Sequence, residues 1–148
     1  MKKKVVKDTP LAEITLRKYE RPINLSEREI IRKICLSLGL LQPGDSRNVI
    51  VDVLHVFLKH KRELDSKEIE ELVKAMRKEH KLPMLGVASS NIRRQIKRLR
   101  DMYLVEKVAN KYRMAENEHL VHLFEEKIET FYLRTIVDRV KDYLRELK

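Results

Sequence analysis

The sequence is poor in residues that cross-link or interrupt a chain. Its 148 residues include three glycines, four prolines, one cysteine and no tryptophan. A single cysteine excludes an internal disulfide and suits a reducing compartment, so we expect a cytoplasmic protein. Cys35 stands among isoleucines and leucines, which predicts a buried, inert thiol. No apolar run approaches the roughly 20 residues that a membrane-spanning helix needs.

Motifs for catalysis and metal binding are missing as well. The chain has no glycine-rich phosphate loop, no nucleophile elbow and no HExxH motif. His119 and His122 are three residues apart, a spacing that lets two ring nitrogens share a helical face, but no cysteine pair supplies further zinc ligands. We therefore expect a protein that is not an enzyme and that holds no metal or other cofactor.

What the chain does have is a concentrated positive charge. The net charge of +10 divides into +4 for residues 1–22, +2 for 23–88, +6 for 89–113 and −2 for 114–148. Such a cluster suits a polyanion, because neutralising phosphates releases condensed counterions. Charged residues make up 38% of the chain, a balance that resembles heat-adapted, archaeal-like proteins.

Apolar spacing predicts four helices in the first two thirds of the chain. They are expected at residues 26–38, 47–60, 65–79 and 89–103. Asp65 and Glu68 form the capping-box pattern of a helix start, as do Ser26 and Glu29. The first helix is expected to end at Gly39 and to bury Ile30, Ile31, Ile34 and Leu38. The basic lead-in, residues 1–22, is open to two interpretations, a short strand near residues 14–18 or a flexible tail.

Residues 89–114 are the most informative part of the chain, and they favour a helix, a strand, a tight turn and a second strand. Ile92, Ile96, Leu99 and Tyr103 recur at helical spacing and form an apolar face. The opposite face carries Asn91, Arg94, Gln95 and Arg98, flanked by Arg93 and Lys97. These long hydrogen-bonding side chains are of the kind that reaches base edges and phosphates in a major groove.

This element order resembles the winged helix-turn-helix domain of DNA-binding proteins. The segment IRRQIKRLRDMYLVEKV, from Ile92 to Val108, is similar to a recognition helix that runs into the first strand of a wing. The family often has glycine where this chain has Tyr103. The resemblance implies a mainly α fold with a small β-hairpin wing. It divides the chain into a basic arm (1–22), a winged-helix domain (23–114) with an extra helix (26–38), and a long C-terminal helix (115–148).

Members of the MarR, PadR and ArsR kinds are single-domain transcription regulators that carry extra helices for dimerisation. The resemblance therefore implies a homodimer that binds double-stranded DNA in a sequence-specific way, with helix 89–103 in the major groove. The alternative is a winged-helix adaptor that docks on another protein in a nucleoprotein complex. A small-molecule effector is left open.

The candidate DNA contacts lie on the helix and the wing. On the helix they are Ser89, Ser90, Asn91, Arg93, Arg94, Gln95, Lys97 and Arg98. Arg94 and Arg98 suit guanine or phosphate, and Asn91 and Gln95 suit adenine edges. The short wing between residues 104 and 114 is expected to reach phosphates only, through Lys107, Lys111 and Arg113. A merely solvated basic surface is the alternative, and Lys2, Lys3, Lys4 and Lys7 are candidates for an arm that extends the contact.

The C-terminal segment from about Asn117 to Leu147 lacks glycine and proline, so it can run as one helix roughly 45 Å long. Its apolar positions form a stripe that needs a partner surface. The stripe consists of Leu120, Phe124, Ile128, Tyr132, Ile136, Val140, Tyr143 and Leu147. Pairing with the same helix of a second copy is the favoured interpretation. The alternative is that the helix folds back on its own domain.

Overall fold

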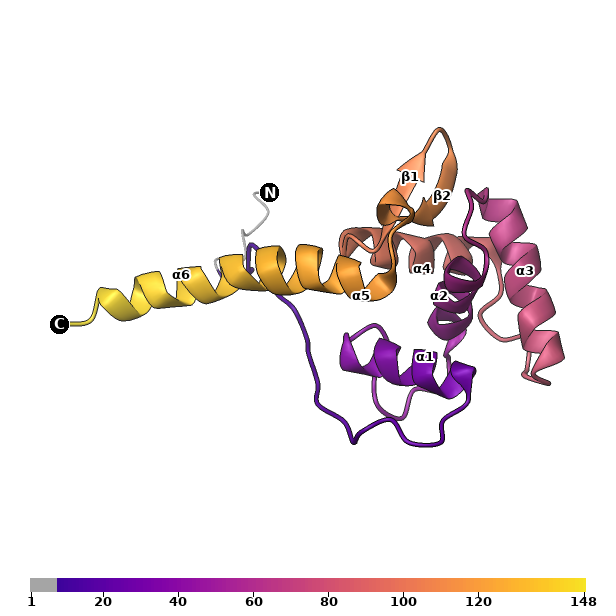
Figure 1. The fold of residues 1–148 in the computed structure, drawn as a ribbon, viewed down its shortest axis with the longest axis horizontal. Coiled ribbons are helices and arrows are strands. Elements are labelled where there is room, and N and C mark those ends of the chain that lie inside the picture. The colour runs from indigo at the N-terminus through magenta and orange to yellow at the C-terminus, as the bar shows by residue number, and fades with distance from the viewer. Residues whose placement is uncertain (1–7) are drawn as a thin grey trace, which may run out of the picture.

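Helix α2 (Val49–Lys59) lies at the centre of the fold, and three other helices pack around it (Figure 1). They are α1 (Glu27–Ser37), α3 (Ser66–Glu79) and α4 (Ser89–Asp101). Every residue from Val49 to Phe57 is buried, so α2 is apolar on all sides except at Asp52 and His55. The four helices expected from the sequence are confirmed, with ends that shift by two residues or fewer. This computed structural model describes residues 8–148.

Local chemistry marks most of the helix ends, and at the start of α1 Ser26 Oγ accepts from Glu29 N at 3.3 Å. The Asp65 carboxylate accepts from Glu68 N at 2.8 Å and the Glu68 carboxylate accepts from Asp65 N at 3.3 Å, which confirms the capping box. Gly39 follows α1 with a φ of +72°, and a Cβ there would lie 2.7 Å from Thr15 Cβ, so the position requires glycine. The N-cap of α4 is Ala88, so Ser89 and Ser90 are its first residues and neither caps it.

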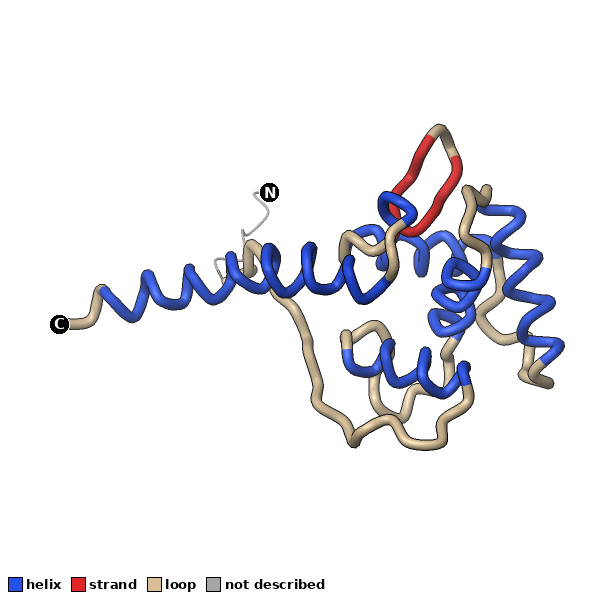
Figure 2. Tube along the Cα trace, viewed as in Figure 1, coloured by secondary structure: helices blue, strands red, loops and turns tan. Residues whose placement is uncertain are grey.

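A two-stranded hairpin follows α4 and confirms the wing (Figure 2). Strands β1 (Val105–Val108) and β2 (Lys111–Met114) pair antiparallel. Ala109 and Asn110 form the turn with φ of 48° and 67°, the two left-handed residues that a tight right-twisting hairpin favours. Leu64 and Tyr112 exchange backbone hydrogen bonds of 2.8 and 2.7 Å, which tie the hairpin to the segment between α2 and α3. The fold is therefore mainly helical with a small β-hairpin.

The C-terminal helix, residues 120–145, is one continuous rod that begins on the domain and then leaves it (Figure 1). After a short turn, η1 (Ala115–Asn117), it comprises α5 (Leu120–Leu123), a π-helical stretch η2 (Phe124–Tyr132) and α6 (Leu133–Arg145). Leu123 and Ile128 are buried in the core, whereas α6 buries no residue. The first half thus folds back on its own domain, and the second half projects from it.

Residues 8–25, here called the strap, run in extended form without a strand and are held by the rest of the chain. Arg17 N donates to Ser37 O at 2.9 Å, and its guanidinium donates to Leu36 O at 2.8 Å. The Tyr132 hydroxyl donates to Glu13 O at 3.0 Å. Neither the expected strand nor a free tail describes this part of the chain. The basic residues of the expected arm from Lys2 to Lys7 lie outside the described residues.

Burial of the first helix differs in part from the expectation. Cys35 is fully buried, and burial raises the pKa of its thiol to about 12, which confirms an inert thiol. Ile30, expected in the core, remains 41% exposed because it lies on a second apolar side of α1. Within residues 8–148, no helix combines the length and apolarity that crossing a bilayer requires.

A buried ionic cluster joins α2 to its neighbours. The Asp52 carboxylate is fully buried and accepts from the guanidinium groups of Arg28 on α1 and Arg77 on α3, the latter at 2.7 Å. Arg77 is only 2% exposed and also donates to Pro83 O at 2.8 Å and to Asn48 Oδ1 at 3.0 Å. Since Pro83 precedes α4, one carboxylate and two guanidinium groups orient three helices and the loop that leads to the basic helix.

Replacing Asp52 with asparagine should destabilise the protein by about 3 kcal/mol, because two buried guanidinium groups would lose their counter-charge. Urea unfolding followed by circular dichroism measures this. Asp138→Asn is the matched control, since Asp138 is an exposed partner of Arg134 on α6 and should leave the urea midpoint unchanged. Equal midpoints for the two variants would contradict a structural role for the cluster.

The corner after α4 gives a second prediction. Tyr103 has a φ of +63°. Its ring packs edge-on against that of Tyr132, with the two ring centres 5.9 Å apart. Tyr103→Ala and Tyr103→Gly both remove this ring contact, but only glycine also removes the strain of a left-handed backbone. The glycine variant should therefore be more stable than the alanine variant by about 1 kcal/mol in urea unfolding. Equal stability would show that the corner stores no strain.

Candidate nucleic-acid interface

Helix α4 is seated by its apolar face. Ile92, Ile96 and Leu99 are buried against α2 and α3. On the other side, Ser90, Arg93, Arg94, Lys97 and Arg100 are exposed. The sequence expectation of one buried and one solvent-facing side is confirmed for these residues, and the exposed side carries four cationic side chains.

The predicted base-reading side chains do not all lie on that exposed side. Asn91 Nδ2 donates to Gly86 O at 2.7 Å, and Gln95 Nε2 donates to Asn91 Oδ1 at 3.1 Å. Arg98 donates to Gln95 Oε1 at 2.8 Å and to Leu40 O at 2.7 Å. These four hydrogen bonds form a chain along one flank of α4, here called the relay. The relay joins α4 to the segment after α1. Asn91, Gln95 and Arg98 are accordingly half-buried.

The side of α4 that faces solvent therefore differs from the predicted one by a rotation about the helix axis. Arg94 and Lys97 point away from the core, whereas Arg98 turns toward residues 39–41. The sequence could not show this rotation, because periodicity identifies the buried face but not which flank a distant loop covers. Among the four exposed cations of α4, and within residues 8–148, Lys97 is the one that forms a salt bridge. Its partner is the Asp101 carboxylate, 3.0 Å away.

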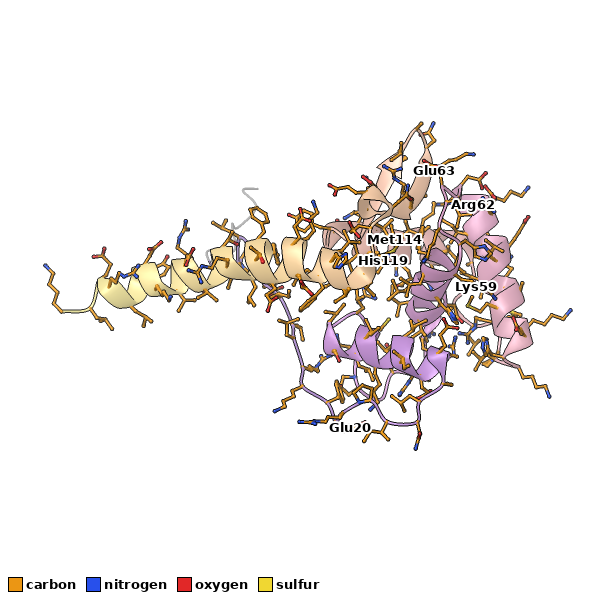
Figure 3. All side chains as sticks on the ribbon, viewed as in Figure 1. Glu20, Lys59, Arg62, Glu63, Met114 and His119 are labelled. Atoms are coloured by element: carbon orange, nitrogen blue, oxygen red, sulfur yellow. The ribbon has the colours of Figure 1, made fainter. Side chains whose placement is uncertain are left out.

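The wing adds two exposed lysines and one tethered arginine. Lys107 and Lys111 are exposed, whereas Arg113 donates to Glu106 at 3.2 Å and lies 3.4 Å from a Glu63 carboxylate oxygen. Glu63 lies beside the wing (Figure 3). Because both carboxylates neutralise it, Arg113 contributes less free positive charge than the sequence suggested. Its main contacts tie the wing to the domain.

Tyr112 links the helix to the wing. The Arg100 guanidinium and the Lys107 ammonium each lie 5.8 Å from the centre of its ring. Two cations are thus held beside one aromatic ring, so α4 and the wing form a continuous basic surface. We define the basic surface as Arg93, Arg94, Lys97, Arg100, Lys107 and Lys111, all of which are exposed.

A polar groove borders this surface on the side of the relay. It has a volume of about 380 Å³ and lies between residues 40–50 and α4. Arg47, Arg94 and Arg98 line it together with Asn91 and Gln95. Sequence reasoning did not identify Arg47 as a candidate, since it sits in a turn far from the basic segment and only the fold brings it to α4. The guanidinium groups of Arg47 and Arg94 provide donors suited to a phosphate oxygen, whereas Arg98 is engaged by Leu40 O and Gln95, and Asp45 also lines the groove.

The two serines at the start of α4 differ in their surroundings. Ser89 Oγ donates to the Glu70 carboxylate at 2.7 Å, and this bond, together with Lys74, lowers the pKa of Glu70. Ser90 is exposed and faces the same side as Arg94. Ser89 therefore links α3 to α4, and Ser90 is the serine placed to contact a ligand on the basic surface.

The predicted dimer residues differ in how much of each side chain its own chain covers. Ile128 is buried in its own domain, so its place in a dimer interface is withdrawn. Leu120, Phe124 and Tyr132 are partly covered by the same chain. Ile136 is half-buried, while Val140, Tyr143 and Leu147 are 53%, 74% and 80% exposed. Among the predicted dimer residues, Val140, Tyr143 and Leu147 are thus the ones that remain exposed.

His119 and His122 contact each other and a neighbouring glutamate on the C-terminal helix. His122 Nδ1 lies 3.0 Å from the Glu118 carboxylate, and this hydrogen bond raises the pKa of His122. The rings of His119 and His122 pack edge-on, with their centres 5.9 Å apart. Within the described part of the chain, no group of three or more His, Cys, Asp or Glu side chains is placed to hold a metal ion.

Comparison with known proteins gives no further assignment. No protein-family model matches the chain, and neither a curated protein nor a solved structure matches it significantly.

The relay predicts that two arginines of α4 differ in their effect on stability. Arg98→Ala should lower the free energy of unfolding by about 2 kcal/mol, because it removes charged hydrogen bonds to Leu40 O and Gln95. Arg94→Ala, on the same helix, should leave the urea midpoint unchanged. Equal midpoints would indicate that the relay contributes nothing to folding.

Proposed function

We propose that the chain is a sequence-specific regulator of transcription that binds double-stranded DNA through α4 and the wing. The observation that supports this is the basic surface, six exposed cations spread over the helix and hairpin with one salt bridge among them. A solvated surface of ordinary composition would intersperse acids with bases. Here cations predominate on α4 and the wing, and the acids beside them are Glu70 and Glu71 next to Arg93 and Asp101 next to Lys97. Such an excess of positive charge suits binding to a line of phosphates.

In this proposal, different residues of the basic surface contact the phosphates and the bases. Arg93, Arg100, Lys107 and Lys111 lie on the flank that leads to the wing and suit phosphate oxygens, which fix the register of a protein on a duplex. Ser90 and Arg94 project from the first turns of α4, and an arginine there can donate two hydrogen bonds to guanine O6 and N7. Asn91 and Gln95 read adenine in this proposal only when DNA displaces their relay bonds.

The groove between residues 40–50 and α4 extends the proposed contact. Arg47 supplies a cation from outside the helix-and-wing unit and lines the groove together with Arg94. A DNA backbone that follows the groove would meet both guanidinium groups. This role supports phosphate binding rather than base reading, because guanidinium groups around a rim hold an oxyanion without regard to sequence.

The test is titration of duplex DNA with the full chain at several salt concentrations. Affinity should fall steeply with salt, with a slope of about −0.9 in log K against log salt for each phosphate neutralised. Arg94→Ala and Lys97→Ala should each weaken binding and reduce the slope by about one when the lost contact is to phosphate. A contact to guanine would instead cost about 1–3 kcal/mol at one base position.

Arg145→Ala is the matched control, since Arg145 is exposed on α6 and far along the chain from the basic surface. It should bind DNA as the unmodified chain does. Duplex RNA should compete poorly, because its deep, narrow major groove excludes a helix. Unchanged DNA affinity in both Arg94→Ala and Lys97→Ala would overturn the proposal and favour the adaptor alternative.

A further inference from the structure

The strap binds both ends of the turn that follows α1. This turn, residues 36–42, is here called the α1 turn. The Arg17 guanidinium of the strap donates to Leu36 O at 2.8 Å and to Leu41 O at 3.2 Å. It also donates to Gln42 Oε1 at 2.7 Å. One side chain of the strap therefore bridges the beginning and the end of the α1 turn.

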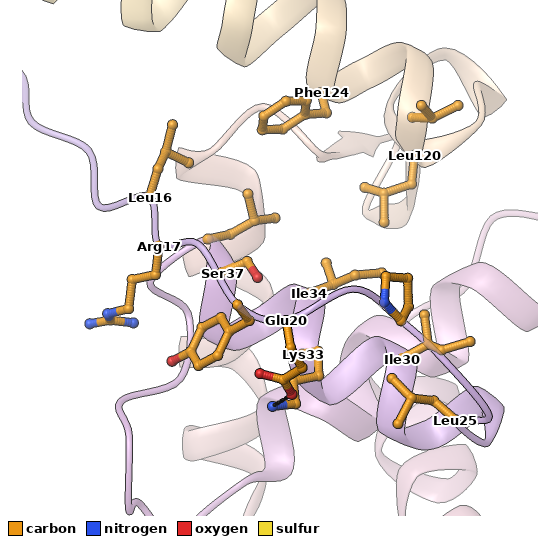
Figure 4. Close-up of a pocket in the computed structure, with 14 residues that line it drawn as sticks. Leu16, Arg17, Glu20, Leu25, Ile30, Lys33, Ile34, Ser37, Leu120 and Phe124 are labelled. Atoms are coloured by element: carbon orange, nitrogen blue, oxygen red, sulfur yellow. Dashed lines mark hydrogen bonds and ion pairs between the residues drawn. The ribbon is translucent and has the colours of Figure 1, made fainter.

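Arg17 reaches the α1 turn because neighbouring side chains of an extended segment point in opposite directions. Leu16 lines an apolar groove together with Phe124 of the C-terminal helix, and the Arg17 guanidinium is turned the other way (Figure 4). The Arg17 backbone N–H donates to Ser37 O at 2.9 Å. The backbone and the side chain of this one residue thus both hold the strap to the α1 turn.

The middle of the α1 turn holds Arg98 of α4. The Arg98 guanidinium donates to Leu40 O at 2.7 Å and to Gly39 O at 3.5 Å. Its third acceptor is the Gln95 amide oxygen at 2.8 Å. All three acceptors are neutral, so these hydrogen bonds keep the guanidinium in place without cancelling its charge. Arg98 would become a free cation beside the DNA site if the two carbonyls turned away from it.

Gly39 is the residue at which these carbonyls can turn. It has a φ of +72°, in a region that glycine enters and leaves more easily than any other residue. Thr15 of the strap restricts this freedom, because a Cβ built on Gly39 would lie 2.7 Å from Thr15 Cβ. The side chains of Leu40 and Leu41 are 3% and 2% exposed, so they anchor the turn while its peptide groups rotate.

We propose that Arg17 is a positioning residue for Arg98, and that the docked strap thereby keeps Arg98 out of the DNA contact. With the strap in place, the α1 turn presents its carbonyls to Arg98. With the strap released, rotation at Gly39 frees Arg98 into the groove that Arg47 and Arg94 also line. The inference rests on the proposed DNA-binding function and assigns the strap a regulatory role at that same site.

The strap is suited to release because little of it is covered. Between residues 8 and 25 no residue is buried, and Ile14 and Tyr19 are partly buried against the core. The ion pair of Glu20 with Lys33, at 2.7 Å, is exposed on the glutamate side and contributes little to stability. Segments with few buried contacts open at a lower free energy than the core does.

Hydrogen exchange of the full chain, followed by NMR, tests the positioning role without DNA. The amides of Leu40 and Leu41 donate to Cys35 O at 2.8 and 3.1 Å, so their exchange reports opening of the α1 turn. Arg17→Ala should speed both rates about tenfold, because local opening becomes easier. Lys18→Ala is the matched control, since it removes the same charge from the next, exposed position of the strap and should leave both rates unchanged.

Titration of duplex DNA at several salt concentrations tests the release of Arg98. Arg17→Ala removes a cation, yet it should make the slope of log K against log salt steeper by about 0.9, the contribution of one further phosphate. Combining Arg17→Ala with Arg98→Ala should restore the slope of the unmodified chain. Lys18→Ala should not steepen the slope. A merely structural defect would weaken binding without adding a phosphate contact.

Unchanged exchange rates in Arg17→Ala would overturn the inference, and so would a slope that does not steepen. If the unmodified chain does not bind DNA, the proposed function fails, and the exchange rates alone decide whether Arg17 positions the α1 turn. Circular dichroism verifies that each variant is folded. If Arg17→Ala does not fold, Gln42→Ala replaces it, because this variant removes one exposed acceptor of Arg17 and should shift both measurements in the same direction.

Discussion

The Asp52 carboxylate is the constraint on which the helical domain depends. It is fully buried in the most apolar helix of the chain and accepts from Arg28 and Arg77, which arrive from α1 and α3. A buried carboxylate without these partners would be very costly, so the three helices pack in the one arrangement that brings both guanidinium groups to it. Arg77 extends the cluster to Pro83 O and thereby fixes the path into α4.

The position of the basic surface follows from that arrangement. Ile92, Ile96 and Leu99 seat α4 on α2 and α3, and the relay from Gly86 to Leu40 sets its rotation. Arg94 and Lys97 are left facing solvent, while Tyr112 holds Arg100 and Lys107 beside one ring. The same hydrogen bonds that stabilise the domain thus decide which cations remain free to meet a polyanion, and Arg98 and Arg113 are largely used within the protein.

The C-terminal helix serves two purposes along its length. Leu123 and Ile128 complete the domain core, and Tyr132 holds the strap through Glu13. From Val137 onward every residue of the helix is exposed, yet the helix keeps an apolar stripe with coiled-coil spacing. The change from docked to free helix occurs within one unbroken rod, so a partner that held α6 would be held rigidly with respect to the domain.

The sequence by itself determined the elements of this fold. Helical spacing located α1 to α4 to within two residues, the Asp65–Glu68 pair marked the start of α3, and Gly39 marked the end of α1. These features depend on neighbours within one or two turns, so they are readable from a short stretch of chain. The net charge of residues 89–113 likewise indicates the candidate interface without any tertiary contact.

Only the tertiary structure decided how those elements use their surfaces. The partners of Asp52 lie 24 and 25 residues away on either side, and Arg98 meets Leu40 across 58 residues, separations at which no local pattern indicates a contact. For the same reason the sequence placed Ile30 in the core and Ile128 in a dimer interface. Periodicity shows that a face is apolar, but which surface covers that face depends on the packing of the whole chain.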